Sequence, residues 1–389
     1  MPERRCAADP DLSSLMLVAG EASGDLHGAT LSRALKRQAP SWNLMGMGGP
    51  RMAATGVRLL VDHTGLAVVG GSEALPRLPR LVGSFRLLAK TLRTERPRAL
   101  VLIDFPEFNL RLARVARRLE IPVVYFIPPQ VWAWRPGRTR LIARLTTRVL
   151  AVFPFEPPLY ETAGARVEFV GHPILDDLPL DLDRASARRA LGTPADATAV
   201  GLLPGSRREE VDRLLPRMVE AAHLICREIP WVRFLVAPAP SVDRARVDAL
   251  LTQAPPTLSL AWGRSREVMA ASDLLLVASG TATLEAALLG TPMVVCYRVS
   301  RFTELIARPL IRIPWVSLAN IVSGRGVVPE LLQGQARPTR MAEEAVGLLK
   351  APERLRAQRQ AFAELKGALG SPGVAERAAR QILEVAGCA

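Results

Sequence analysis

Short apolar segments that end at glycine or proline recur along this chain, and longer amphipathic stretches separate them. This alternation is typical of βα units, in which a buried parallel strand is followed by a helix that covers the sheet. We expect strands over 15–19, 99–103, 123–127, 149–153, 199–203, 234–237, 274–278 and 293–297. Nearly all of these runs are continuously apolar rather than alternating, so helices should cover both faces of each sheet.

The chain of 389 residues is long enough for two domains of ordinary size. A polar, proline-punctuated stretch follows the sequence GHPILDD and is the clearest domain boundary. We predict an N-terminal domain over 1–176, a C-terminal domain over 177–351, and C-terminal helices over 352–389 that return to the N-terminal domain. The predicted fold is α/β, with two doubly wound, Rossmann-like domains that face each other across a cleft.

The formal net charge of +14 requires a surface that attracts anions, such as nucleic acid, anionic lipid or a phosphorylated substrate. Charge alone does not choose among these, and arginines on solvated helix faces are the simpler explanation for much of the excess. A nucleic acid partner is disfavoured, because the sequence contains no recognised nucleic-acid-binding module. The sequence also lacks the ~18 consecutive apolar residues of a membrane-spanning helix and a secretory signal. Any membrane contact should therefore be peripheral.

Neither the cysteines nor the histidines show metal-ligand spacing. Asp181 and Asp183 form a DxD pair of the kind that holds a divalent ion in many sugar transferases. They lie in the predicted linker rather than at a strand end, which favours a solvated loop. We predict a reduced cytoplasmic protein with no metal and no cofactor.

The first predicted strand runs into AGEASGDLHGA, at the sheet edge where open α/β sheets bind their ligands. This turn is not a dinucleotide fingerprint, because the carboxylates of Glu21 and Asp25 would face a pyrophosphate. Acids suit sugar hydroxyls better, so Glu21, Ser23, Gly24 and Asp25 are candidates for binding an acceptor sugar. The alternative is a capping turn, in which Ser23 and Asp25 satisfy helix N–H groups. A second glycine-rich turn at 46–52 is weak evidence by itself.

Asp104 directly follows the strand predicted at 99–103. A partly desolvated carboxylate at such a strand end can have a raised pKa and act as a general base for an attacking hydroxyl. The alternative is that Asp104 caps the helix that begins near Phe108. Spacing does not decide between the two roles.

Two strand ends in the second half lead into small-residue turns and helix starts, PGSRREEV after Leu203 and SGTATLE after Ala278. Such turns present backbone N–H groups and the positive end of a helix to an anion. Together they predict a nucleotide-sugar site in which Arg207 contacts phosphate and Glu285 accepts bonds from ribose hydroxyls. The candidate residues of this site are Gly205, Ser206, Arg207, Ser279, Gly280, Thr281 and Glu285.

A helix predicted from about residue 78 carries apolar residues on one face and basic residues around it. The candidate membrane-facing residues are Leu78, Leu81, Val82 and Phe85, followed by Leu88 and Leu92. This is the form of a helix that lies in a membrane interface. The alternative is an ordinary amphipathic helix packed on the sheet, because core-facing helices show the same pattern.

Nine motifs occur in order between residues 19 and 321: AGEASGD, GPRM, IDFPEFN, PPQVWAWR, FPFE, GHP, LLPGSR, SGTATLE and VSLANI. This set resembles the lipid-A-disaccharide synthases. The resemblance implies a GT-B fold and an inverting transfer of 2,3-diacylglucosamine from UDP-2,3-diacylglucosamine to 2,3-diacylglucosamine 1-phosphate. The products would be a β-1,6-linked disaccharide and UDP. The resemblance also implies a partner for the basic helix predicted from about residue 78, namely the anionic cytoplasmic face of the inner membrane.

The resemblance further implies roles for individual residues. Asp104 corresponds to the proposed catalytic base, Arg207 to the arginine of PGSR, and Asn320 to a catalytic asparagine after VSL. Trp132 and His172 are expected to line the cleft, with buried core positions as the alternative. Where many members have a Met-Gly pair, this chain has Val69 and Gly70, and the family motif IDAPDFN becomes IDFPEFN through Phe105 and Glu107. These changes leave acyl-chain specificity open.

Two rival functions remain at this stage, and the sequence leaves the oligomeric state open. One is another GT-B protein, such as a UDP-N-acetylglucosamine 2-epimerase or the muramyl-pathway transferase, although the GGTGGH turn expected of the latter is absent. The other is a membrane-associated protein that binds a nucleotide sugar without turnover.

Overall fold

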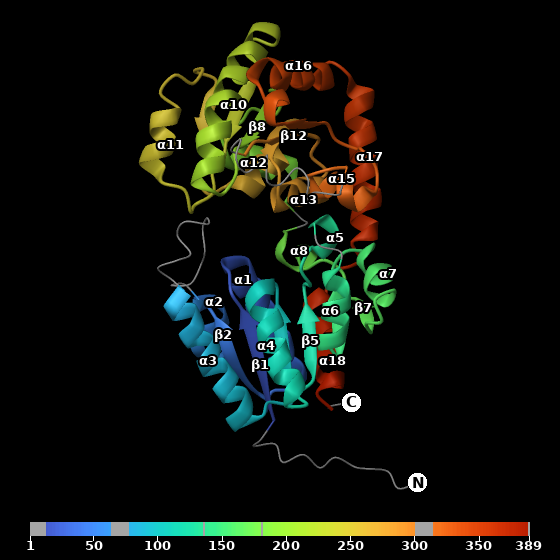
Figure 1. Cartoon of the computed structure of the whole chain (residues 1–389). Coiled ribbons are helices and arrows are strands. Elements are labelled where there is room, and N and C mark those ends of the chain that lie inside the picture. Colours follow the sequence, from blue (N-terminus) through green and yellow to red (C-terminus); the bar gives the residue numbers. More distant parts are fainter. Residues whose placement is uncertain (1–12, 64–77, 135–136, 180–181, 300–313, 388–389) are drawn as a thin grey trace. The chain divides into compact units, whose positions relative to one another are not determined.

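The computed structural model describes residues 13–63, 78–134, 137–179, 182–299 and 314–387. The chain forms two compact units, Met1–Asp177 with Leu369–Ala389, and Leu178–Ala368. Each unit is a parallel sheet with helices packed on it (Figure 1). The segment 352–389, treated as one piece above, is divided between the units. Helix α17 (Pro352–Ala368) belongs to the second unit and α18 (Val374–Val385) to the first.

The sheet of the first unit has seven strands in the order β3-β2-β1-β4-β5-β6-β7, and neighbouring strands pair in parallel. The order reverses between β1 and β4, which makes this pair the topological switch point. The strands are β1 (Ser14–Ala19), β2 (Asn43–Gly48), β3 (Arg58–Asp62), β4 (Ala99–Ile103), β5 (Val123–Phe126), β6 (Arg148–Ala151) and β7 (Val167–Phe169).

Helices cover both faces of this sheet, as the continuously apolar strands predicted. Helix α1 packs against α2 and α18, while α4 packs against α3 and α6. One face forms a core in which Met16 and Leu100 of the sheet join Leu88 of α3 and Leu112 of α4. The helices are α1 (Ala22–Gln38), α2 (Pro50–Ala53), α3 (Leu78–Glu95), α4 (Pro106–Arg118), α5 (Val131–Trp134), α6 (Arg138–Leu145), α7 (Glu156–Glu161), α8 (Ile174–Asp177) and α18.

The second unit repeats the architecture with six parallel strands in the order β10-β9-β8-β11-β12-β13. Here the order reverses between β8 and β11. The strands are β8 (Ala199–Leu203), β9 (Arg233–Val236), β10 (Leu258–Leu260), β11 (Leu274–Ala278), β12 (Met293–Tyr297) and β13 (Glu330–Leu332). The helices are α9 (Arg184–Ala190), α10 (Arg208–Glu228), α11 (Arg244–Leu250), α12 (Ser265–Ala271), α13 (Thr281–Leu288), α15 (Leu318–Ser323), α16 (Pro338–Leu349) and α17, with a 3-10 turn η4 (Gln333–Gln335).

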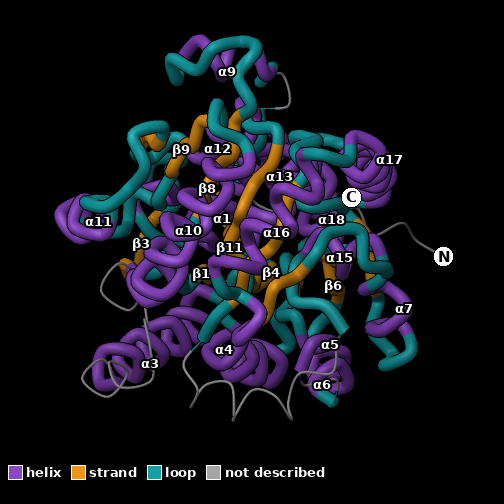
Figure 2. Tube along the Cα trace, turned by 90° about the horizontal axis from the view of Figure 1, so that it is seen from above, coloured by secondary structure: helices purple, strands orange, loops and turns teal. Residues whose placement is uncertain are grey.

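Helices enclose the core of the second unit. Helix α10 packs against α16, and α13 packs against α15 and α17. Helices appear purple and strands orange in Figure 2, where this packing of helices around strands can be followed. The central strands, such as β4, β8 and β11, are buried along their whole length and are entirely apolar, which is why the sequence predicts them.

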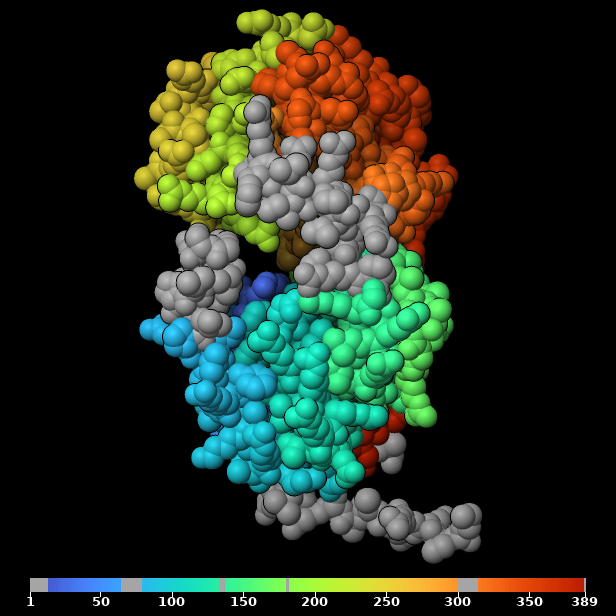
Figure 3. Space-filling view, in the orientation of Figure 1, coloured from blue at the N-terminus to red at the C-terminus, as the bar shows by residue number. Residues whose placement is uncertain are grey.

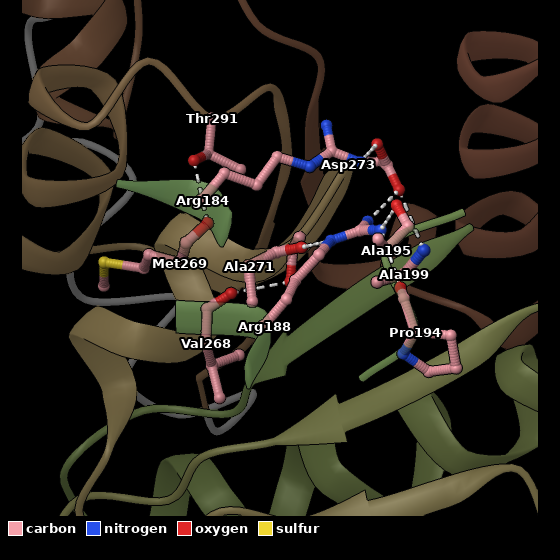
Figure 4. A network of polar contacts seen from close by, with 11 residues as sticks. Arg184, Arg188, Pro194, Ala195, Ala199, Val268, Met269, Ala271, Asp273 and Thr291 are labelled. Carbon is pink, nitrogen blue, oxygen red and sulfur yellow. Dashed lines mark hydrogen bonds and ion pairs between the residues drawn. The ribbon is translucent and has the colours of Figure 1, made fainter. Parts of the chain in front are cut away.

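Helix α9 is fastened to the second unit through the buried guanidinium of Arg188, which is 3% exposed. Figure 4 shows this side chain among the carbonyl oxygens of Ala271, Pro194 and Ala195, with the Asp273 carboxylate beside it. The same Asp273 oxygen also accepts the backbone N–H of Ala199, the first residue of β8. One charged network therefore ties the start of the second unit to α12 and to β8.

Helix α3 lies on the surface of the first unit, where it appears light blue in Figure 3. Its residues Leu81 and Phe85 pack against the core, and the Phe85 ring meets Phe108 edge-on at 5.8 Å. Leu81 and Phe85 therefore support the alternative to a membrane-facing helix, which is an amphipathic helix packed on the sheet. Val82 and Leu87 are large apolar residues of α3 that are exposed to solvent, at 39% and 43%. The side chain of Leu78 lies outside the described residues.

Candidate functional site

The ends of β1 and β4 lie side by side at the switch point of the first unit. Ala19 pairs with Ile103, so the AGEASGD turn and Asp104 follow adjacent strands at the same edge of the sheet. This is the position at which open α/β sheets bind ligands. The topology thus brings together the two segments that the sequence singled out separately.

The backbone at Asp104 is held in an unusual conformation. Asp104 and Phe105 both have φ of 47°, the left-handed region that residues other than glycine rarely occupy. Among the described side chains none caps α4, whose N-cap residue is Phe105 and whose first turn begins at Pro106. Asp104 therefore does not take the helix-capping role that was its alternative.

The carboxyl of Asp104 is half-buried, and its pKa is raised to about 6. Burial is the largest cause, the nearby charge of Glu21 adds to the rise, and the N–H of Phe105 opposes it. A carboxylate with this pKa is ionised at neutral pH and still basic enough to take a proton from a hydroxyl in a transition state.

The ring of Phe105 packs directly against Gly20, where there is no room for a side chain. The same ring stacks on that of Phe108, with 5.5 Å between the ring centroids. A Cβ at position 20 would lie 2.2 Å from an atom of the Phe105 ring. The glycine after β1 thus leaves room for the ring that follows Asp104. Phe105, one of the departures from the family pattern, is a packing residue here.

Asp25 does not face a ligand, which corrects the acceptor-binding role expected for it. Its carboxylate is 3% exposed and accepts the backbone N–H groups of Gly49, Arg51 and Met52 at 2.8 to 3.1 Å. It therefore caps α2 and joins two motifs of the sequence, AGEASGD and GPRM. Glu21 and Ser23 are exposed at the start of α1, whereas Gly24 is buried against Ala19.

Trp132 and His172 belong to an aromatic cluster of the first unit. The indole of Trp132 meets the Phe155 ring at 4.9 Å, and the imidazole of His172 lies 5.0 Å from the Phe153 ring. The Nδ1 atom of His172 accepts the N–H of Ile174, and burial, with His27 nearby, lowers the pKa of His172 to about 3. His172 is therefore neutral and structural in this arrangement.

The second unit contains a cavity of about 330 Å³ at its own switch point, where Leu203 of β8 pairs with Val277 of β11. All seven residues proposed for the nucleotide sugar line this cavity. Four further lining residues come from other elements and carry no motif that would have marked them: Ala239, Pro240, Ser265 and Met269. The loop after β9 supplies the first two, and helix α12 supplies the others.

The two turns of this cavity differ in how their N–H groups are used. At the start of α10, the Glu210 carboxylate accepts the N–H groups of Ser206 and Arg207, and the Arg207 guanidinium pairs with it at 3.2 Å. At the start of α13, within the described part of the chain, no side chain caps Gly280. The uncapped α13 turn is the better place for an anion, with Arg207, 73% exposed, able to turn toward it.

Comparison with known proteins decides the family. The sequence profile described as Lipid-A-disaccharide synthetase matches residues 15–384. The chain is 44% identical over 373 residues to the lipid-A-disaccharide synthase of Myxococcus xanthus (strain DK1622), covering 95% of this chain and 97% of the relative. It is 45% identical over 366 residues to that of Syntrophus aciditrophicus (strain SB), covering 94% and 96%. The chain belongs to the lipid-A-disaccharide synthase family.

Solved structures place the synthase fold in the GT-B class of glycosyltransferases, as the sequence predicted. The glycotransferase of kitacinnamycin is similar with a TM-score of 0.66 at 18% identity, over 96% of this chain and 99% of that one. A UDP-GlcNAc 2-epimerase from Neisseria meningitidis, solved with UDP-GlcNAc bound, has a TM-score of 0.62 at 13% identity, over 95% and 100%. Family membership makes this chain a glycosyltransferase, and the likeness to the epimerase is one of fold.

The Asn320 of the synthase motif VSLANI has no free group for chemistry, which corrects the catalytic role expected for it. It is 1% exposed. Its Oδ1 accepts the N–H groups of Val327 and Val328, and its Nδ2 donates to the Val328 carbonyl and to Glu330. The amide holds the loop before β13 in place, so Asn320 shapes the unit rather than touching a reacting atom.

Glu285 lines the cavity, and its carboxylate is already paired with an arginine. One of its oxygens, Oε1, pairs with the Arg266 guanidinium at 3.0 Å. The pairing fixes the carboxylate on the cavity wall and leaves Oε2 to accept a hydrogen bond from a ligand hydroxyl. Arg266 itself had no sequence signal, because an arginine in a helical segment is usually a solvated residue.

Within the described ranges, no group of three or more histidine, cysteine or acidic side chains could hold a metal ion. Asp183 caps α9 through the N–H of Ser186 at 2.9 Å, while Asp181 lies outside those ranges, as do Val69 and Gly70. None of the helices in these ranges combines the length and the apolar character that spanning a bilayer needs.

Proposed function

We propose that this chain transfers 2,3-diacylglucosamine from UDP-2,3-diacylglucosamine to the 6'-hydroxyl of 2,3-diacylglucosamine 1-phosphate. The transfer inverts the anomeric carbon and gives a β-1,6-linked disaccharide and UDP. Family membership supports the substrate classes. The observation that carries the mechanism is Asp104, a half-buried carboxylate of raised pKa in a strained turn at the switch point of the first unit. Strained backbone of this kind is concentrated at functional sites.

Asp104 is the general base of this reaction. Its carboxylate takes the proton of the acceptor hydroxyl as the oxygen attacks the anomeric carbon, and the bond from that carbon to the β-phosphate oxygen breaks. Such a base contributes about 10² to 10⁴ in rate. Glu21 and Ser23 bind hydroxyls of the acceptor sugar in this proposal, which their exposure on the neighbouring turn supports.

The cavity of the second unit holds the UDP part of the donor. The uncapped start of α13 and the guanidinium of Arg207 meet the diphosphate and stabilise its charge as UDP leaves. Glu285, fixed by Arg266, accepts bonds from the ribose hydroxyls. This charge stabilisation takes the part that a divalent ion plays in other sugar transferases, so we propose turnover without a metal.

Both substrates carry acyl chains, so the protein must work at a lipid surface. We place the membrane-facing side of α3 at Val82 and Leu87, which are exposed and lie beside the exposed Arg80, Arg86 and Lys90. Apolar side chains ringed by cations bind an anionic surface through burial and charge together. The proposed location is the cytoplasmic face of the inner membrane.

Mass spectrometry of the products tests the function. Purified protein with both lipid substrates should form the disaccharide and UDP, with and without a chelator. Absence of disaccharide under conditions in which a related synthase works would contradict the proposal, and hydrolysis or epimerisation of the UDP-sugar would point to another activity of the same fold.

A further inference from the structure

The carbonyl oxygen of Asp104 is held by two buried side chains from different elements. Nδ2 of Asn109, in α4, donates to it at 2.6 Å. The hydroxyl of Tyr125, in β5, donates to it at 2.9 Å. Both side chains are completely buried, at 0% exposure, so neither can touch a substrate.

These two bonds oppose a relaxation that would remove the base from the sheet edge. Two consecutive left-handed residues other than glycine are strained, and they persist only where the surroundings over-determine them. Aspartate just before a helix ordinarily adopts an extended conformation and caps the helix with its side chain. Released from its anchors, Asp104 would have that conformation available, and its carboxylate would turn toward the start of α4.

We propose that Tyr125 and Asn109 are positioning residues for the general base. By holding the Asp104 carbonyl they keep Asp104 and Phe105 left-handed and present the carboxylate at the carboxyl end of β4. The proposal rests on the role proposed for Asp104. It assigns to the asparagine of IDFPEFN and to a strand tyrosine a contribution to rate that burial alone would not suggest.

The variant Tyr125→Phe tests this with little disturbance, because it keeps the buried ring and removes one hydroxyl. We expect kcat to fall about two- to tenfold, the effect of losing one neutral hydrogen bond, with donor KM and UDP affinity unchanged. Tyr160→Phe is the matched control. Tyr160 is another fully buried tyrosine of the same unit, and its hydroxyl donates to the backbone carbonyl of Pro129 at 3.2 Å.

Tyr160→Phe should lower the melting temperature comparably and leave kcat near the wild-type value. Equal kcat in the two tyrosine variants would overturn the proposal. Asn109→Ala should also lower kcat. If this variant does not fold, the comparison of Tyr125→Phe with Tyr160→Phe still tests the proposal.

A double-mutant cycle separates positioning from general loosening. In an Asp104→Asn background, the Tyr125→Phe substitution should cost nothing further in the residual rate, because the base it positions is gone. A loss of the same factor in both backgrounds would overturn the proposal while leaving Asp104 as the base. Wild-type kcat for Asp104→Asn alone would instead remove the base assignment, and the positioning role with it.

Discussion

The indole N–H of Trp132 donates a hydrogen bond of 3.2 Å to Oε1 of Glu156, a carboxylate that is 0% exposed. The other carboxylate oxygen accepts the N–H groups of Val152 and Phe153 at 3.0 Å each. Burial raises the pKa of Glu156 to about 7, and these three hydrogen bonds oppose the rise. A single buried acid thus joins the motif FPFE to the motif PPQVWAWR.

Glu156→Ala should lower the free energy of unfolding by about 1 to 3 kcal/mol, because it leaves three buried N–H groups without their acceptor. Urea denaturation at pH 5 measures the change, because below the folded pKa of about 7 the buried carboxyl keeps its proton and the cost of ionising it does not enter. Trp132→Phe is the control, since it removes a donor and leaves the two backbone bonds, and its cost should be smaller. Equal stability of Glu156→Ala and wild type would show that this carboxyl does not hold these segments together.

Arg188 and Arg184 pair with the same carboxylate, that of Asp273, and should differ in their effect on stability. Arg188→Ala leaves three backbone carbonyls and part of the carboxylate without a buried donor, so we expect a loss of about 3 kcal/mol. Arg184 is 46% exposed, and its pairing should contribute less than about 1 kcal/mol. Thermal unfolding of the two alanine variants checks the order. A larger loss for Arg184→Ala would contradict the network as drawn in Figure 4.

Arg207→Ala should weaken UDP binding and slow turnover, because the guanidinium meets the phosphates in both the ground state and the transition state. Arg208 is the matched control, since it is the next residue, is 78% exposed and does not line the cavity. Calorimetric titration with UDP should therefore show a loss of about tenfold or more for Arg207→Ala and little change for Arg208→Ala. Unchanged UDP affinity in Arg207→Ala would remove this residue from the donor site.

Much of the fold could be predicted because the buried strands leave an unambiguous pattern. All eight strands expected from continuous apolar runs overlap strands of the structure. The glycine-rich stretch at 46–52 has the composition of a turn, yet Gly46 lies inside β2, where a Cβ would sit 1.9 Å from the Leu17 carbonyl oxygen. A glycine that permits close strand pairing looks, in sequence, like a glycine that makes a turn.

The site residues were harder to assign, because one residue type serves two purposes. Asp25 and Asp104 both lie in motifs that follow a strand. The Asp25 carboxylate accepts hydrogen bonds from three backbone N–H groups, whereas the Asp104 carboxylate remains at the edge of the sheet. Both ends of the Asn320 side-chain amide likewise form hydrogen bonds that hold the loop before β13. What separates a cap from a catalytic group is the partner that tertiary structure supplies, and spacing along the chain does not contain it.

The raised pKa of Asp104 makes two predictions that depend on pH. For activity, kcat/KM should rise through an acid limb near pH 6, where the free base ionises. Glu21→Gln should move this limb to lower pH, because the charge of Glu21 is one cause of the raised pKa. A limb that stays in place would mean that burial alone sets the pKa of Asp104.

For stability, the folded protein holds the Asp104 proton up to about pH 6, whereas the unfolded chain releases it near pH 3.8. Raising the pH between these values therefore favours unfolding, and above pH 6 the ionised carboxylate costs the fold its full penalty. Asp104→Asn, which carries no charge, should be more stable than wild type at pH 8, by up to about 3 kcal/mol for a shift of this size. The advantage should shrink as the pH falls below 6 and be small near pH 4.

Denaturant unfolding of wild type and Asp104→Asn across this pH range measures the difference in stability. The kcat of Asp104→Asn, measured alongside, should be about 10² to 10⁴ lower than that of wild type. A gain in stability with a loss of turnover is what a strained catalytic base requires. A variant that is less stable at pH 8 would mean that the carboxylate stabilises the turn, as a structural acid would.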